Sequence, residues 1–178
     1  MFETLDYEVS VELLDTKGHK AIHSKREQVR YIQNNIIAYQ DQAWGEGDFL
    51  KGYHCSPGKL ADSYREGDKT ILLISLQGRR QKGDIDTFHI ERKPTDTFTQ
   101  NKEYTGVEIS HKTKQLTINI FFPKKRPPTS YVLVEKQLKR HTPLSSKHLR
   151  QLKDGRWLLS WSTSKPRLFE NYFIQWEW

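Results

Sequence analysis

The sequence has almost no cysteine and no long hydrophobic run. Cys55 is the only cysteine among 178 residues, so no intramolecular disulfide can form and a reducing compartment is expected. No stretch approaches the ~18 consecutive apolar residues of a membrane-spanning helix. The first ten residues, MFETLDYEVS, carry carboxylates where a secretory signal would carry basic residues. We therefore expect a cytoplasmic protein that makes no use of a membrane.

Catalytic and metal-binding signatures are also missing. The histidines show no zinc-ligand spacing with cysteine, and the Gly-x-Ser-x-Gly motif of serine hydrolases is absent from the sequence. Cys55 follows His54, and neighbours on a strand point to opposite faces, so adjacency alone does not make them a nucleophile and its base. We expect no metal and no cofactor.

One acidic segment, KGDIDTFHIERK, nevertheless holds the residue types of a metal-dependent nuclease. Such a site would bring Asp84 or Asp86 on one strand to Glu91 on the next, around a divalent cation. The separation of five to seven residues leaves no room for two strands and a turn between them. A nuclease-like enzyme is therefore the least favoured of three functional hypotheses.

What the sequence does contain is the two-residue alternation of half-buried strands. Apolar side chains recur at every second position in residues 7–13, 116–122 and 172–178. Aromatic residues make up 12% of the chain and supply much of the core volume. The alternating face of the last segment consists of Tyr172, Ile174, Trp176 and Trp178. Because these rings would be costly on an exposed tail, this segment should pair inside a sheet.

The remaining segments are assigned from their apolar runs and turn residues. Residues 70–76, TILLISL, read as a strand in the centre of its sheet. The turn HKTK at 111–114 should join residues 103–110 and 115–122 into a hairpin. A short helix near 145–153 would begin at Ser145 or Ser146 and end at Asp154-Gly155. Residues 41–68 contain five glycines and read as a long loop or as short strands between turns.

About eight to ten short strands separated by turn signals predict an all-β fold. We expect a single domain, residues 1–178, built as an antiparallel β-sandwich or a flattened barrel. A chain of this length can bury about 70% of its unfolded surface without disulfides or metals. The protein should be a monomer or a small oligomer.

The net charge of +7 is concentrated at one end of the sequence. Residues 1–60 hold 7 Lys and Arg against 9 Asp and Glu, residues 61–122 hold 10 against 9, and residues 123–178 hold 12 against 4. The three net charges are therefore −2, +1 and +8. Such asymmetry favours attraction to an anionic partner without identifying it.

Nucleic-acid binding is the second functional hypothesis. The segment FFPKKRPPTSY, 121–131, ends a strand at Phe122 and continues as a proline-stiffened basic connection, because proline cannot donate to a sheet ladder. Solvated lysines at such a turn are ordinary, so the basic run is also explained without any ligand. The turn GRRQKGD forms a second basic loop. The candidate phosphate-binding residues are Lys124, Lys125, Arg126, Lys139, Arg140, Arg79 and Arg80.

Protein binding is the favoured hypothesis. A rigid β scaffold without catalytic signatures is typical of a non-catalytic interaction module. An exposed sheet edge or the 41–68 segment would bind the partner, with Trp44 and Phe49 as anchors, because tryptophan is enriched among interface hot spots. The alternative remains RNA or DNA bound by the basic C-terminal third.

Overall fold

The fold is built from strands, as the alternation predicts. The computed structural model describes residues 1–44 and 50–178, and these form fourteen strands and one 3-10 turn. The all-β expectation is confirmed, with more strands than the eight to ten expected. No helix in the described residues has the length and apolar character needed to cross a bilayer.

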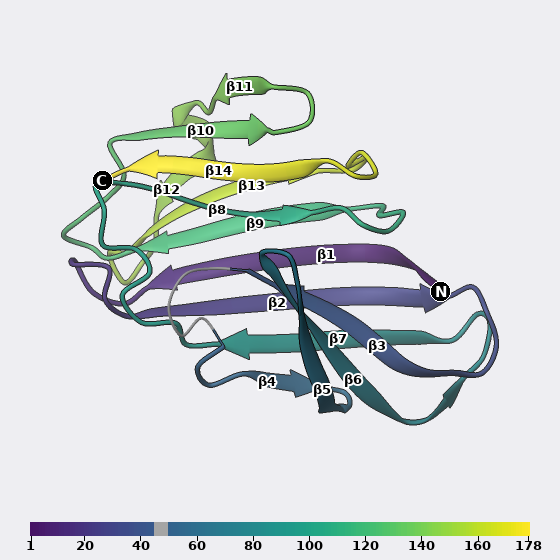
Figure 1. Cartoon of the computed structure of the whole chain (residues 1–178). Helices are drawn as coiled ribbons and strands as arrows, with labels where there is room; N and C mark the ends of the chain where they lie inside the picture. The colour runs from purple at the N-terminus through teal and green to yellow at the C-terminus, as the bar shows by residue number, and fades with distance from the viewer. Residues whose placement is uncertain (45–49) are drawn as a thin grey trace.

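The strands form three sheets (Figure 1). The seven-stranded sheet contains, in spatial order, β12 (Leu149–Gln151), β13 (Trp157–Thr163), β9 (Leu116–Phe122), β1 (Phe2–Leu13), β2 (Ala21–Tyr31), β7 (Ile85–Arg92) and β4 (His54–Ser56). The four-stranded sheet contains β11 (Arg140–Pro143), β10 (Ser130–Glu135), β14 (Asn171–Glu177) and β8 (Lys102–Glu108). The three-stranded sheet contains β3 (Ile36–Ala43), β6 (Lys69–Arg80) and β5 (Lys59–Glu66).

The two smaller sheets cover two halves of one face of the seven-stranded sheet. One core lies under the four-stranded sheet, where Val9 and Ile118 pack with Trp176 of β14. The other lies under the three-stranded sheet, where Val29 and Phe88 pack with residues of β3 and β6. Because Val9, Lys25 and Ile90 are cross-strand partners, their side chains lie on the same face. The seam between the two cores therefore runs over the middle of β1 and β2.

The opposite face of the seven-stranded sheet is polar, which explains the alternation in β1. Arg26 on this face forms ion pairs with Asp6 and Glu8, and the Asn119 side-chain amide donates to Glu8 at 2.9 Å. The register of β1 against β2 shifts between Thr4 and Asp6. This irregularity keeps Phe2 and Thr4 buried while the odd-numbered residues face inward further along the strand.

The aromatic C-terminal strand lies inside its sheet, as expected. β14 pairs with β10 on one side and β8 on the other, and Tyr172, Ile174 and Trp176 are buried. β6, which contains TILLISL, is likewise the central strand of the three-stranded sheet.

The hairpin expected around residues 111–114 is wrong. β8 pairs with β14 and β9 pairs with β1 and β13, so the connection passes from one sheet to another. It runs beside the start of β1, where the Thr4 N–H donates to the Lys112 carbonyl at 2.8 Å and the Lys114 N–H donates to the Thr4 carbonyl at 3.0 Å. The β1–β9 pair is parallel, in a fold expected to be antiparallel. Alternation identifies the buried face of a strand but not its partner.

The short helix expected near 145–153 is also wrong. Only Ser146–His148 form a 3-10 turn, and Ser145 makes no side-chain cap. Residues 149–151 form β12, whose Leu149 and Gln151 pair with Leu159 and Trp157 of β13. Pairing with β13 outweighs the helical spacing of the apolar residues in this segment. Gly155 has a φ of 87° and lies in the turn between β12 and β13.

Candidate functional site

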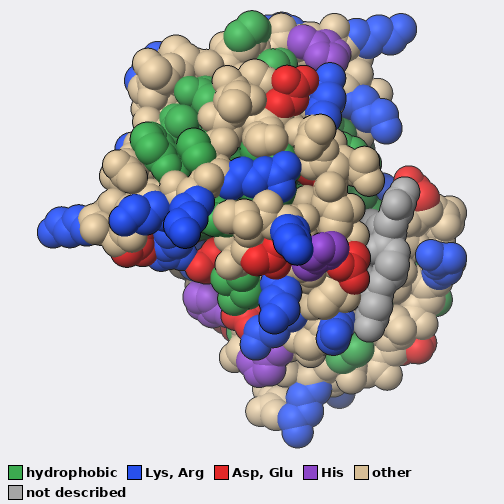
Figure 2. All heavy atoms as spheres, turned by 90° about the vertical axis from the view of Figure 1, so that its left-hand side faces the viewer, with side chains coloured by type: hydrophobic (Ala, Val, Ile, Leu, Met, Phe, Trp, Pro, Cys, Tyr) green, Lys and Arg blue, Asp and Glu red, His purple; other side chains and the backbone are tan. Residues whose placement is uncertain are grey.

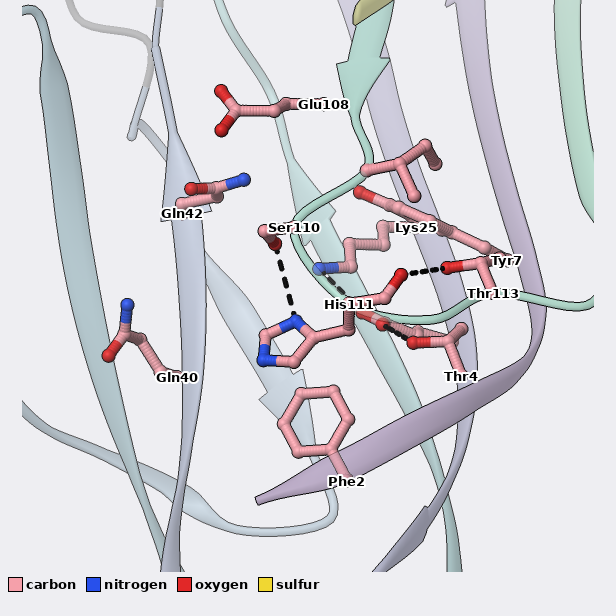
Figure 3. A pocket seen from close by; sticks show the side chains of 12 residues that line it. Phe2, Thr4, Tyr7, Lys25, Gln40, Gln42, Glu108, Ser110, His111 and Thr113 are labelled. Atoms are coloured by element: carbon pink, nitrogen blue, oxygen red, sulfur yellow. Dashed lines mark hydrogen bonds and ion pairs between the residues drawn. The ribbon is translucent and has the colours of Figure 1, made fainter. Parts of the chain in front are cut away.

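A polar cleft lies at the seam between the two smaller sheets (Figure 3). Side chains of β1, β2 and β3 and of the segment after β8 line it, and its cavity of about 30 Å³ has room for about two water molecules. Figure 3 shows Gln40 and Gln42 on one side of the cleft, and Ser110 and His111 on the other. The cleft is therefore sized for water or a small ion.

A buried charge network forms the floor of the cleft. The Lys25 Nζ lies 2.9 Å from Glu27 Oε2 and 2.8 Å from Asp41 Oδ1. Hydroxyl groups also donate hydrogen bonds to both carboxylates. The Thr4 and Tyr39 hydroxyls donate to Glu27 at 2.8 and 2.5 Å. Tyr53 donates to Asp41 at 3.2 Å. Lys25, Glu27 and Asp41 are all buried. Each contacts a group of opposite charge, which a buried charge requires.

The network holds its charges fixed. Burial opposes the charge on Lys25, but Asp41 and Glu27 outweigh it and raise the pKa of Lys25 well above the usual lysine value. Burial likewise opposes the charge on Glu27, yet Lys25 and the bonded hydroxyls lower the pKa of this carboxyl. A general acid or base needs a pKa near the working pH. Lys25 and Glu27 therefore do not suit proton transfer at neutral pH.

The mouth of the cleft brings a serine to a histidine. Ser110 Oγ lies 3.3 Å from His111 Nδ1, and the His111 ring stacks on Phe2 with centroids 4.2 Å apart. A serine nucleophile needs a histidine that an acid orients. Glu108, the carboxylate at this mouth, forms an ion pair with Lys69 instead. The Ser110–His111 contact alone does not make a catalytic site.

The sequence-predicted anchors Trp44 and Phe49 are only partly placed. Trp44 follows β3 and is half-buried. Phe49 lies outside the described residues. The surrounding 41–68 segment contains β4 and β5 instead of a continuous loop, which agrees with the second of the two expectations for it.

Short strands were one of the two expectations for the 41–68 segment, but the sequence does not locate β5 within it. β5 is one of the two edge strands of the three-stranded sheet, and within the described residues it pairs only with β6. Every residue of β5 is exposed, with Leu60 and Tyr64 each at 47%. Its sequence, KLADSYRE, has no apolar alternation because neither face is buried. A fully exposed strand leaves no periodic signal by which to find it.

The predicted phosphate-binding residues fall into three separate groups. Phe121 pairs with Glu12, so Lys124 and Lys125 lie beyond the C-terminal end of β1. Arg79 and Arg80 lie near its N-terminal end, about 40 Å away along the twelve residues of β1. Lys139 and Arg140 lie just after the C-terminal end of β10. The two basic loops are therefore at opposite ends of the seven-stranded sheet.

Three of these basic residues are bound within the molecule. Arg126 donates to the Thr16 carbonyl at 2.6 Å, and its guanidinium lies 3.9 Å from the centroid of the Trp178 ring. Arg80 binds Asp86 at 2.7 Å, and Arg140 forms an ion pair with Glu135. On the face that contains the turns after β1 and β9, Lys and Arg are interspersed with Asp and Glu (Figure 2). Nucleic-acid binding stays a prediction.

The acids of the nuclease hypothesis lie on or beside a single strand. Asp86 and Glu91 both belong to β7, and Asp86 is occupied by Arg80 and by the Tyr31 hydroxyl at 2.9 Å. Glu91 pairs with Lys93 at 3.3 Å. Among the described residues, no group of three or more His, Cys, Asp or Glu side chains converges on a possible metal position.

Comparison with protein-family models and with curated protein sequences finds no match. Among solved structures, the fold is similar to that of an M1 zinc metallopeptidase from Deinococcus radiodurans, with a TM-score of 0.56 and 8% sequence identity. The match covers 97% of this chain and 42% of that chain, so this chain spans less than half of the metallopeptidase. At this identity the likeness concerns the fold alone.

Proposed function

We propose that the protein is a non-catalytic interaction module that binds another protein through the edge strand β5. The observation that carries this proposal is the complete exposure of an eight-residue edge strand. An exposed edge presents unpaired backbone donors and acceptors, and an extended segment of a partner can add to it as a further strand.

The local chemistry of β5 suits this use. Residues 62–66 pair regularly with β6, and the register shift is confined to the other end, between Leu60 and Asp62. The Ser63 N–H donates to Asp62 Oδ1 at 2.8 Å. Rotation of the Asp62 side chain would release this donor to an incoming strand. The exposed Leu60 and Tyr64 side chains would then contact the partner's side chains.

The chemistry of the other candidate groups supports a non-catalytic role. Lys25 and Glu27 hold fixed charges, because each stabilises the charged form of the other. Burial and the nearby Asp41 raise the pKa of the Cys55 thiol to about 11, so it is protonated at neutral pH. A thiol acts as a nucleophile in its thiolate form. Trp44 and Phe49 stay proposed anchors for the same partner, to be tested by substitution with alanine.

Substitution in the middle of β5 tests the proposal. Random peptides displayed on phage are selected against the wild-type protein, and the affinity of the enriched peptides is measured for two variants. Ser63→Pro removes a backbone donor and should weaken binding about tenfold or more. Ser63→Thr keeps that donor and should bind like wild type. Equal binding to both variants would exclude β5 as the site.

A further inference from the structure

A second exposed surface lies where two turns meet at one end of the four-stranded sheet. The turn 136–139 joins β10 to β11, and the turn 164–170 joins β13 to β14 (Figure 1). Together they border an open hollow of about 600 Å³. We name this surface the Phe169 patch and define it by Leu138, Leu168 and Phe169, which line the hollow.

The Phe169 patch exposes large apolar side chains to solvent. Phe169 is 68% exposed, Leu168 49% and Leu138 41%. Single exposed apolar residues are ordinary on a protein surface, but three around one hollow form a contiguous patch. The burial of a phenylalanine ring against a partner contributes more than the burial of most side chains.

Backbone strain is concentrated at the same two turns. Four non-glycine residues in the described chain have positive φ, and two of them, Asn35 and Asp96, are types that tolerate it. The other two are Lys139 with φ 50° and Phe169 with φ 64°, one on each turn of the patch. Strained backbone of this kind tends to occur at functional sites.

Hydrogen bonds hold Phe169 in its outward position. Its N–H donates to the Ile109 carbonyl at 2.7 Å. The buried Glu170 carboxylate accepts from the N–H groups of Gln137 at 2.7 Å and Asn171 at 2.9 Å. Glu170 therefore ties the two turns together. A ring presented by a fixed turn loses little conformational entropy when it binds.

The two turns are positively charged toward solvent. Residues 135–140 and 165–170 hold five Lys and Arg and two Glu, a net charge of 5 − 2 = +3. The two glutamates are buried and serve internal contacts, Glu135 to Arg140 and Glu170 to the backbone. Glu108 at the border is neutralised by its ion pair with Lys69. Within residues 1–44 and 50–178, Lys136, Lys139, Lys165 and Arg167 form no ion pair, so the charge that the two turns offer a partner is cationic.

We infer that the Phe169 patch binds an acidic peptide segment of a partner protein, with a large apolar side chain of that segment inserted against Phe169 and Leu168. The apolar centre supplies the anchor, and the surrounding cations select acidic flanks. This surface is separate from β5, so the inference does not depend on strand pairing there.

Fluorescence anisotropy with a synthetic probe tests the inference. The probe is a fluorescein-labelled peptide of Asp and Glu residues around one central Trp, and two control peptides carry Lys in place of the acids or Ser in place of the Trp. We expect wild-type protein to bind the probe about tenfold or more tightly than either control. Binding should weaken at high salt because the flanking contacts are ionic.

Three variants test whether probe binding depends on the Phe169 patch or on another part of the surface. Phe169→Gly removes the ring and suits the positive φ, so the protein should stay folded and lose binding about tenfold or more. Lys139→Asn introduces a residue type that tolerates positive φ and removes one charge, so it should weaken binding by a smaller factor. Ile37→Ser, at an exposed position on β3, should leave binding unchanged.

Four outcomes would overturn the inference. The first two are unchanged probe binding by Phe169→Gly and equal binding of the lysine peptide. The third is a Phe169-dependent dimer without peptide in analytical ultracentrifugation, which would assign the patch to a second copy. The fourth is Phe169-dependent binding of an oligothymidylate with tighter affinity than the probe, which would assign it to nucleic acid.

Discussion

The Nζ of Lys25 lies 2.8 Å from Oδ1 of Asp41, across the space between the seven-stranded and the three-stranded sheet. Lys25 belongs to β2 and Asp41 to β3, so this ion pair joins the two sheets within their largely apolar shared core. The Tyr39–Glu27 hydrogen bond and the Arg80–Asp86 ion pair also join them. A buried charge pair is costly to break, because the remaining partner stays desolvated.

Replacement of Lys25 by methionine should destabilise the fold strongly. Glu27 and Asp41 would both lose their cation while they remain buried. We expect the free energy of unfolding in urea to fall by about 3–5 kcal/mol. A loss below about 1 kcal/mol would show that the network is open to water.

Neutralising both carboxylates as well should recover much of the lost unfolding free energy. The triple variant Lys25→Met, Glu27→Gln, Asp41→Asn buries no charge in the network, so its unfolding free energy should exceed that of Lys25→Met alone. The hydroxyls of Thr4, Tyr39 and Tyr53 can still donate to the amide oxygens. A triple variant less stable than the single one would contradict this account of the cleft.

Stability should fall when the pH drops below about 6.5, the usual histidine pKa. Burial, with Arg92 and Lys25 nearby, lowers the pKa of His23 far below this value, and burial lowers that of His111. The unfolded chain then takes up protons before the folded protein, so stability is complete above this pH and is lost as the pH falls. Each histidine contributes up to about 1.4 kcal/mol per pH unit.

Urea unfolding at a series of pH values between about 7 and 5 measures this dependence. His23→Gln should reduce the slope and leave the contribution of His111. Glu27 does not contribute to the pH dependence between about pH 7 and 5. Its pKa is lowered in the folded protein, so its effect on stability appears only below the usual glutamate pKa. An unchanged slope in His23→Gln would mean that other groups cause the pH dependence.

Arg126 should contribute to stability, whereas its neighbour Lys125 should not. Arg126→Ala loses the stacking on Trp178 and the hydrogen bond to Thr16, and we expect a loss of about 1–2 kcal/mol. Lys125 is exposed, and Lys125→Ala is the matched control. Thermal unfolding of the two variants compares them directly. Equal melting temperatures would assign both residues to the solvated surface.

Phe169→Gly should be as stable as wild type or more stable. Glycine adopts a φ of 64° without the cost of about 1–2 kcal/mol that a side chain incurs in the left-handed region. The exposed ring contributes little burial that could be lost. Calorimetric melting temperatures should therefore be equal or higher. A marked decrease would show that the ring packs against the fold.

Much of the fold follows from the sequence because burial on one face enforces alternation. The inward positions of β1, β9 and β14 were predictable, and the proline-rich segment after Phe122 ends β9 as expected. Strand partners were not predictable, since β8 and β9 are adjacent in sequence yet belong to different sheets. Partner choice depends on which apolar faces meet in space, which no local pattern records.

The sites were harder to predict than the fold. On β2 the charged Lys25 and Glu27 share a face with Ala21, Val29 and Tyr31, and this contradiction in the pattern could have marked the cleft. β5 and Phe169 left no such signal, because exposed positions do not restrict residue type. The basic residues were identified from composition. Composition cannot distinguish Arg126, which contacts Thr16 and Trp178, from the exposed Lys124 and Lys125.

Hydrogen exchange of the β5 amides, with and without a peptide selected against the protein, tests the central claim most directly. If the partner adds a strand to the free edge, amides within residues 59–66 exchange more slowly in the complex, and the peptide fails to bind Ser63→Pro. Protection confined to other regions, such as the 123–129 connection, together with full binding by Ser63→Pro, would contradict the proposal.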